Sequence, residues 1–106
     1  MSETNFIKTA LTFLRYHPSV AWAERMNTGK IRKVRFGFKG LSDIIGQLKT
    51  GEFLAIELKD PSVKNPDKHA TLQQLEFINM VINNGGYAGI ANCIEHLEQI
   101  LDKNKK

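Results

Sequence analysis

The segment from Asp43 to Lys59 constrains the fold of this chain more than any other. Two apolar runs, Asp43–Leu48 and Glu52–Lys59, are separated only by the turn residues Lys49-Thr50-Gly51. Turn residues between two apolar runs predict a β-hairpin. Strand side chains alternate, so one face of the second run is apolar until it ends in Glu57 and Lys59. In this register Asp43 lies opposite the end of the partner strand, and the two carboxylates meet.

This trio predicts chemistry as well as structure. Asp43 and Glu57 can bind a hard divalent cation, Mg²⁺ or Mn²⁺, through their oxygens, and the Leu58 backbone carbonyl is a further candidate ligand. Lys59 can orient or deprotonate a metal-bound water, or stabilise charge that develops on a phosphate. Two simpler interpretations stay open. Glu-x-Lys at a strand end is also typical of a surface ion pair, and an aspartate near a glycine is often a turn residue.

Two further polar residues are candidates for the same site. Gln74 shares a helical stripe with Phe77, Ile78 and Val81, so we expect it to face inward toward a partner. Thr71-x-x-Gln74 is equally the pattern of a helix capping box. Glu3 shares a stripe with apolar residues of the first helix and can turn toward the metal, although an acid in a first turn also complements the helix dipole.

A basic segment precedes the hairpin. Residues alternate from Lys30 to Lys39, which predicts one strand with a buried face and a basic face. A lysine-bearing edge strand that only prevents aggregation gives the same pattern. The candidate DNA-binding residues are Lys30, Arg32, Lys33, Arg35 and Lys39.

Composition sets broad limits. The chain has 106 residues, which suits one domain over 1–106, and its net charge of +4 makes an anionic partner plausible. Cys93 is the only cysteine, so no intrachain disulfide can form. No secretion signal and no membrane-spanning run is evident, and we expect a cytoplasmic protein without a membrane partner.

The remaining elements follow from periodicity and from their end signals. A first helix is capped by Ser2 and ends at His17-Pro18, and Gly residues follow a second helix. We expect an α/β fold with a mixed central sheet flanked by helices, in the order αβββαβα. The other predicted elements are a strand at Val20–Met26, a helix at Thr71–Asn83, a strand at Tyr87–Ala91 and a last helix marked by Ile94, Leu97, Ile100 and Leu101.

Taken in order, these motifs resemble the VRR-NUC domain, the virus-type replication-repair nuclease domain of the PD-(D/E)xK superfamily. The resemblance covers almost the whole chain, and the ordered set is far more specific than any single motif. One position departs from the superfamily name, because Ser42 and not proline precedes Asp43. The matching segments are Arg25–Gly29, Val34–Gly46, Phe53–Lys59, Thr71-x-x-Gln74-x-x-Phe77 and Gly85–Gly89.

The resemblance implies a restriction-endonuclease-like core and Mg²⁺- or Mn²⁺-dependent phosphodiester hydrolysis. By matching position, Asp43 and Glu57 are implied metal ligands, Lys59 the catalytic lysine and Gln74 the helix glutamine, while Glu3 matches an acidic position only loosely. Stand-alone domains of this size are typical of phages and mobile elements, which implies the cytoplasm of a bacterial host. They are similar to Holliday-junction resolvases, which act as homodimers.

We therefore expect a metal-dependent, structure-selective DNA endonuclease that resolves four-way junctions as a homodimer. A non-catalytic nucleic-acid-binding module with the same fold is the alternative. A small α/β interaction domain with an incidental ion pair is a third interpretation.

Overall fold

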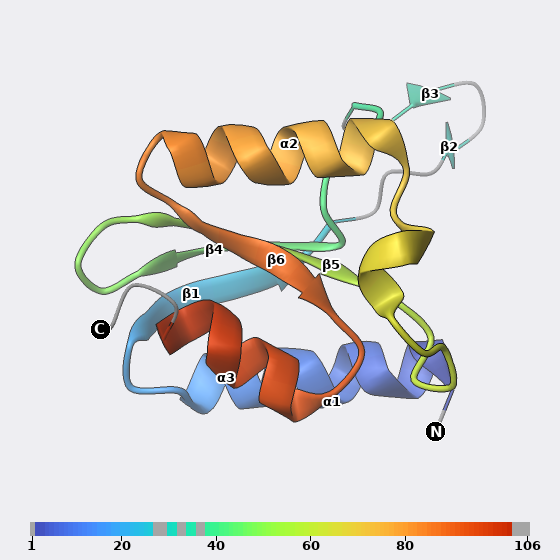
Figure 1. Cartoon of the computed structure of the whole chain (residues 1–106). Helices are drawn as coiled ribbons and strands as arrows, with labels where there is room; N and C mark the ends of the chain where they lie inside the picture. Colours follow the sequence, from blue (N-terminus) through green and yellow to red (C-terminus); the bar gives the residue numbers. More distant parts are fainter. Residues whose placement is uncertain (1, 27–29, 32–33, 36–37, 103–106) are drawn as a thin grey trace.

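A four-stranded mixed sheet forms the centre of the structure (Figure 1). The computed structural model describes residues 2–26, 30–31, 34–35 and 38–102. The sheet order is β1-β4-β5-β6; β1 and β4 and also β4 and β5 are antiparallel, whereas β5 and β6 are parallel. The strands are β1 (Val20–Arg25), β4 (Ile44–Leu48), β5 (Phe53–Leu58) and β6 (Tyr87–Ala91).

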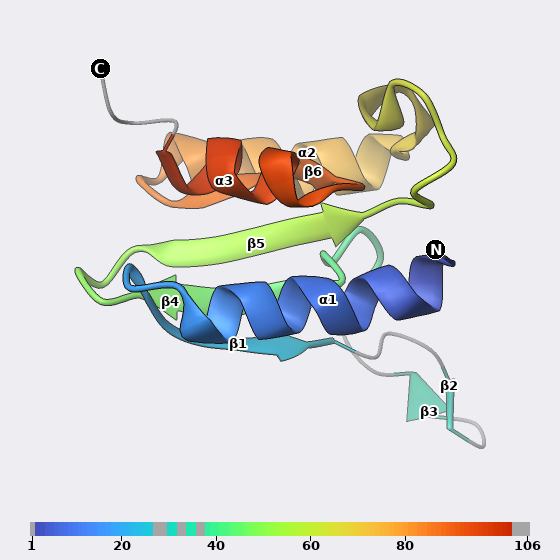
Figure 2. The same ribbon diagram turned by 90° about the horizontal axis from the view of Figure 1, so that it is seen from below.

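Helices cover both faces of this sheet. The helices α1 (Glu3–Tyr16) and α3 (Ile94–Asp102) lie on one face, and α2 (Leu72–Asn83) lies on the other (Figures 1 and 2). A short 3₁₀ helix, η1 (Pro66–His69), precedes α2. The predicted α/β class, the mixed sheet with flanking helices and the order αβββαβα agree with the helices and with the strands of this sheet. Among the described residues, no helix combines the length and apolarity needed to cross a membrane.

The strand β5 is buried on both faces, which explains its nearly continuous apolar sequence. Leu54 and Ile56 belong to the core formed with α1 and α3. Ala55 belongs to a second core formed with α2. Glu57 follows Ala55 on the α2 side, so a carboxylate enters the molecule beneath α2.

The β4–β5 hairpin has the predicted register. Ile44 pairs with Ile56 at the last position of the ladder, and Asp43 and Glu57 come next on the two strands. The Asp43 carbonyl oxygen accepts a hydrogen bond from the Met26 amide at 2.7 Å. The backbone of Asp43 is therefore held at the sheet although the residue lies just outside β4.

The prediction of one strand over Lys30–Lys39 is wrong. The structure has two short strands there, β2 (Lys30–Ile31) and β3 (Val34–Arg35), which pair antiparallel with each other and form a separate sheet. Ile31 pairs with Val34 and Lys30 with Arg35. An alternating pattern does not reveal where a chain reverses, so one long strand and a small hairpin look alike in sequence.

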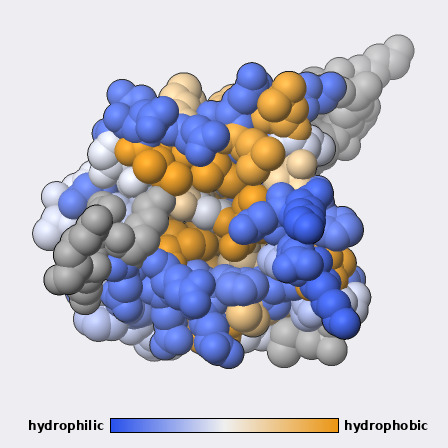
Figure 3. Space-filling view, in the orientation of Figure 1, coloured by the Kyte–Doolittle hydropathy of each residue, from blue (hydrophilic) through white to orange (hydrophobic). Residues whose placement is uncertain are grey.

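The helix α2 is only partly covered. Phe77, Ile78 and Val81 are its buried residues. Its exposed apolar residues are Leu72, Leu75, Met80 and Ile82. Figure 3 shows apolar surface in the upper part of the view, where α2 lies in Figure 1. The position of α2 over the sheet therefore depends on a narrow buried stripe and on the contacts at its N-terminus.

One such contact requires a glycine. Gly40, in the loop that leads to Asp43, has φ +92°, and a Cβ atom there would lie 2.5 Å from the carbonyl oxygen of Gln73. Only glycine combines that conformation with so close an approach of two backbones. The loop before Asp43 is thereby packed against the first turn of α2.

We expect Gly40→Ala to destabilise the protein more than Gly85→Ala. Gly85 has a similar φ of +90°, but nothing lies within 4 Å of a Cβ placed there. Gly85→Ala should cost about 1–2 kcal/mol of conformational strain, and Gly40→Ala about 1–3 kcal/mol more because of the clash. Urea denaturation of both variants measures the difference. Equal losses would show that the contact with Gln73 is unimportant.

Candidate active site

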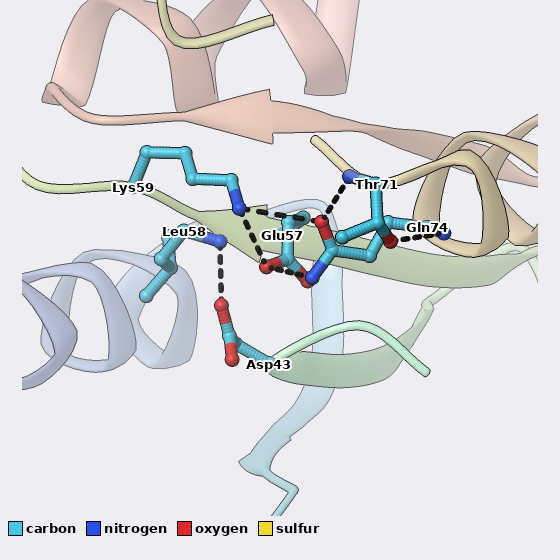
Figure 4. A network of polar contacts seen from close by, with 6 residues as sticks. All are labelled: Asp43, Glu57, Leu58, Lys59, Thr71 and Gln74. Atoms are coloured by element: carbon cyan, nitrogen blue, oxygen red, sulfur yellow. Dashed lines mark hydrogen bonds and ion pairs between the residues drawn. The ribbon is translucent and has the colours of Figure 1, made fainter. Parts of the chain in front are cut away.

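The predicted site residues come together at the carboxyl end of β5, beneath the first turn of α2 (Figure 4). Glu57 is in β5, Lys59 directly follows that strand, and Asp43 directly precedes β4. Gln74 is in the first turn of α2. Four side chains from three segments of the chain thus meet at one end of the hairpin, because the hairpin register and the position of α2 bring them there.

Glu57 is the central residue of this group. Its side chain is only 5% exposed. Oε2 accepts a hydrogen bond from Gln74 Nε2 at 2.9 Å and lies 3.5 Å from Lys59 Nζ. Oε1 is buried and has no hydrogen-bond partner among the described residues. A buried polar atom without a partner is uncommon in native proteins, and a bound ion is one explanation for it.

Gln74 has both of the roles that its sequence pattern allowed. Its amide nitrogen donates to Thr71 Oγ1 at 3.1 Å, and its side-chain Oε1 accepts from the Thr71 amide at 2.9 Å, which completes a capping box. The same Oε1 accepts from Lys59 Nζ at 3.2 Å, while Nε2 donates to Glu57. Gln74 therefore joins the N-terminal turn of α2 to the C-terminal end of β5.

The Asp43 side chain links the two strands at the open end of the β4–β5 hairpin. Its Oδ2 accepts a hydrogen bond from the Leu58 backbone amide at 2.8 Å. The sequence indicated Leu58 only through its carbonyl, and the amide contact becomes visible only in the structure. The Asp43 carboxylate also lies within hydrogen-bonding reach of the Glu57 carboxyl group.

Lys59 is held at both ends. Its backbone amide donates to the Ala91 carbonyl at 3.0 Å, and its side chain is 17% exposed. The loop after Lys59 is fixed by Asn92, whose Nδ2 donates to the carbonyls of Asp60 at 3.1 Å and Val63 at 2.7 Å. Sequence reasoning missed Asn92; its only signal is a polar residue directly after a buried strand.

The environment of Glu57 raises its pKa to about 8, well above the ordinary value of 4.5. Burial is the largest cause, because it disfavours the charged form, and the Asp43 carboxylate beside it acts in the same direction. Lys59 acts in the opposite direction without offsetting them. A bound cation would provide the positive charge that this pair of carboxylates lacks.

Other sequence predictions fall outside this group. Glu3 is exposed in the first turn of α1 and forms no cluster with Asp43 and Glu57. Lys39 is exposed. Arg32 and Lys33 lie outside the described residues, and the same holds for the side chains of Lys30 and Arg35.

The residues present fit a magnesium-type ion. No three His, Cys, Asp or Glu residues gather into a metal-binding group anywhere in the described part of the chain. Magnesium does not need three, because it keeps several waters and binds one or two carboxylates together with substrate phosphates. The candidate ligands are Glu57 Oε1, which has no hydrogen-bond partner in the described segments, and the Asp43 oxygen that does not accept from the Leu58 amide.

Comparison with known proteins gives no family name. No family model matches the chain, and neither a curated protein nor a solved structure matches it. The resemblance to VRR-NUC domains therefore rests on the sequence motifs.

The raised pKa of Glu57 predicts how stability depends on pH. The folded, metal-free protein binds this proton more tightly than the unfolded chain does, so its contribution to stability is complete below pH 4.5 and is lost as pH rises through about 8. Glu57→Gln keeps the shape of the protonated acid. It should therefore reduce the loss of unfolding free energy between pH 5 and 8 by about 1 kcal/mol or more. Urea denaturation in EDTA measures it, with the exposed Glu98→Gln as the control. A decline that persists in Glu57→Gln would contradict this assignment.

Proposed function

We propose that this protein is a Mg²⁺- or Mn²⁺-dependent endonuclease of the VRR-NUC type with a restriction-endonuclease-like core. The observation that carries the proposal is the arrangement of Asp43, Glu57 and Lys59 at the end of the hairpin, where Glu57 Oε1 is buried without a hydrogen-bond partner in the part of the chain that the structure describes. Burial of a carboxylate with a strongly raised pKa is more typical of functional sites than of structural ion pairs.

The proposed roles are those of metal ligands for the carboxylates and of a charge-stabilising group for Lys59. Oδ1 of Asp43 and Oε1 of Glu57 would hold the cation. The N–H and C=O of a strand residue point to the same side, and the Leu58 N–H points to Asp43, so the Leu58 carbonyl is a suitable third ligand. When bound, the cation acidifies a water and offsets negative charge on the phosphate. Lys59 Nζ, beside both Glu57 and Gln74, orients that water or stabilises the charge that develops.

The substrate we propose is branched DNA, cut by a homodimer. A four-way junction has two strands to cut, and a dimer with two-fold symmetry provides two sites in a matching arrangement. The basic residues between Lys30 and Lys39 would contact phosphates, which position DNA without reading its sequence. The net charge of +4 supports an anionic partner.

A binding module that does not cut is the second candidate. The exposed Lys39 and the basic β2–β3 segment would suit both functions. Glu57 favours the nuclease, because a module that only binds phosphate gains nothing from a buried carboxylate that repels it.

Cleavage of a labelled four-way junction, compared with linear duplex, tests the proposed function. We expect cutting with Mg²⁺ or Mn²⁺, none with EDTA, and none with Asp43→Asn. Lys59→Met should slow single-turnover cleavage by about 10²- to 10⁴-fold. Asp67→Asn, which changes an exposed aspartate of η1, is the matched control. Tight junction binding without cutting by the wild type would favour the binding module instead.

The salt dependence of DNA binding tests the basic segment. Replacing Lys30, Arg32, Lys33, Arg35 and Lys39 together by glutamine should weaken binding to all DNA sequences. It should also reduce the slope of log K against log salt by at most about 4.5, or 0.9 for each lost phosphate contact. Fluorescence anisotropy at several salt concentrations measures the slope. Lys49→Gln, in the β4–β5 turn, should leave the slope unchanged. If the variant with all five substitutions has the wild-type slope, DNA does not bind to this basic segment.

A further inference from the structure

The capping box of α2 and the candidate active site share one side-chain amide. Gln74 Oε1 accepts from two donors, the Thr71 amide at 2.9 Å and Lys59 Nζ at 3.2 Å. Gln74 Nε2 donates to Glu57 Oε2 at 2.9 Å. Each of these three hydrogen bonds of the Gln74 side-chain amide therefore pairs a donor with an acceptor.

The reverse orientation of the amide is unfavourable. If the amide turned over, Nε2 would face the Thr71 N–H and the Lys59 ammonium group, and both are donors only. Oε1 would then face Glu57 Oε2, and an ionised carboxylate offers no donor to it. The Thr71 N–H is fixed by the backbone at the helix start, so the cap specifies which end of the amide points to Glu57.

The orientation of the amide decides which Glu57 oxygen stays free. Oε2 is occupied by Gln74 Nε2 and lies beside Lys59 Nζ, whereas Oε1 is buried without a partner. The carboxylate is therefore presented through one defined oxygen. Outer-shell hydrogen bonds of this kind orient the ligands of metal sites.

We propose that the N-cap of α2 selects the Glu57 oxygen that is available to a divalent cation, which makes Thr71 a positioning residue for the active site. This inference rests on the proposed function. Thr71 is exposed, and within the described part of the chain its hydrogen bonds are with Gln74 and Leu75, so it acts on Glu57 and Lys59 through Gln74. Apart from the packing of Gln73 against Gly40, the first turn of α2 has no buried apolar residue, so the loss of the cap loosens the Gln74 side chain.

Thr71→Ala tests this role, because it removes the hydroxyl that accepts from the Gln74 backbone N–H and so loosens the helix start that holds the Thr71 N–H against Gln74 Oε1. We expect Mn²⁺ affinity, measured by electron paramagnetic resonance, to fall by about tenfold, the lower end of what outer-shell substitutions cost. Thr71→Ser keeps the hydroxyl and should restore the affinity. In NMR spectra of the metal-free protein, the Gln74 side-chain NH₂ protons should exchange slowly in the wild type and in Thr71→Ser, and quickly in Thr71→Ala.

Ser2→Ala is the matched control for stability. Ser2 caps α1 through its Oγ, which accepts from the Asn5 amide at 3.2 Å, and among the described residues it forms no hydrogen bond with Asp43, Glu57, Lys59 or Gln74. Ser2→Ala should lower the melting temperature as a lost cap does, and it should leave Mn²⁺ affinity and Gln74 exchange unchanged.

Gln74→Glu separates the two roles of residue 74. A glutamate there still accepts from the Thr71 amide, as in other capping boxes, but it lacks the donor for Glu57. We expect it to retain the capping hydrogen bonds but to remove the donor that holds Glu57 Oε2, so that Mn²⁺ affinity falls although the cap is kept.

The outcomes distinguish the inference from the function on which it rests. Wild-type Mn²⁺ affinity and slow Gln74 exchange in Thr71→Ala would overturn the positioning role of Thr71, even if the wild type cuts DNA. A wild type that binds no Mn²⁺ but shows slow Gln74 exchange that Thr71→Ala abolishes would overturn the nuclease proposal and confirm the cap as the device that orients the amide.

Discussion

The burial of the Glu57 carboxylate is the constraint on which the rest of the site depends. A charged or polar group that leaves water must find partners inside the protein. Gln74 provides one hydrogen bond, and Lys59 provides a nearby positive charge. These partners come from α2 and from the end of β5, so the apolar packing that places α2 on the sheet also assembles the polar site.

The partners themselves are held by backbone features. The capping box at Thr71 fixes Gln74, the Ala91 carbonyl fixes the backbone of Lys59, and Asn92 fixes the loop that follows. Gly40 allows the loop before Asp43 to reach the first turn of α2. The geometry of the site is therefore specified by turns and caps, while the hydrophobic cores bury its side chains.

Much of this arrangement could be predicted from the sequence because it follows from local periodicity. Turn residues and strand alternation are enough to place Asp43 opposite Glu57 and to put Lys59 on the same face. The two interpretations of Gln74 proved compatible, since one amide has both donor and acceptor groups. The suggestion of a surface ion pair does not hold, because the Glu57 side chain is 5% and the Lys59 side chain 17% exposed.

The features that could not be predicted depend on contacts between distant segments. Whether Lys30–Lys39 continues as a strand or reverses depends on its pairing partner, which its own alternation does not encode. The position of Glu3 depends on how α1 is rotated on the sheet, and there the residue lies on the solvent side. The role of Asn92 depends on a loop some thirty positions earlier, and no local pattern indicates such a contact.

Anomalous diffraction from Mn²⁺-soaked crystals would locate the proposed metal centre. We expect one strong Mn²⁺ peak beneath the first turn of α2, with Oδ1 of Asp43 and Oε1 of Glu57 both at about 2.0–2.3 Å. It also predicts that Glu57 Oε2 remains hydrogen-bonded to Gln74. A Mn²⁺ ion bound elsewhere with these two oxygens left empty, or no bound ion at millimolar Mn²⁺, would contradict the proposed metal centre.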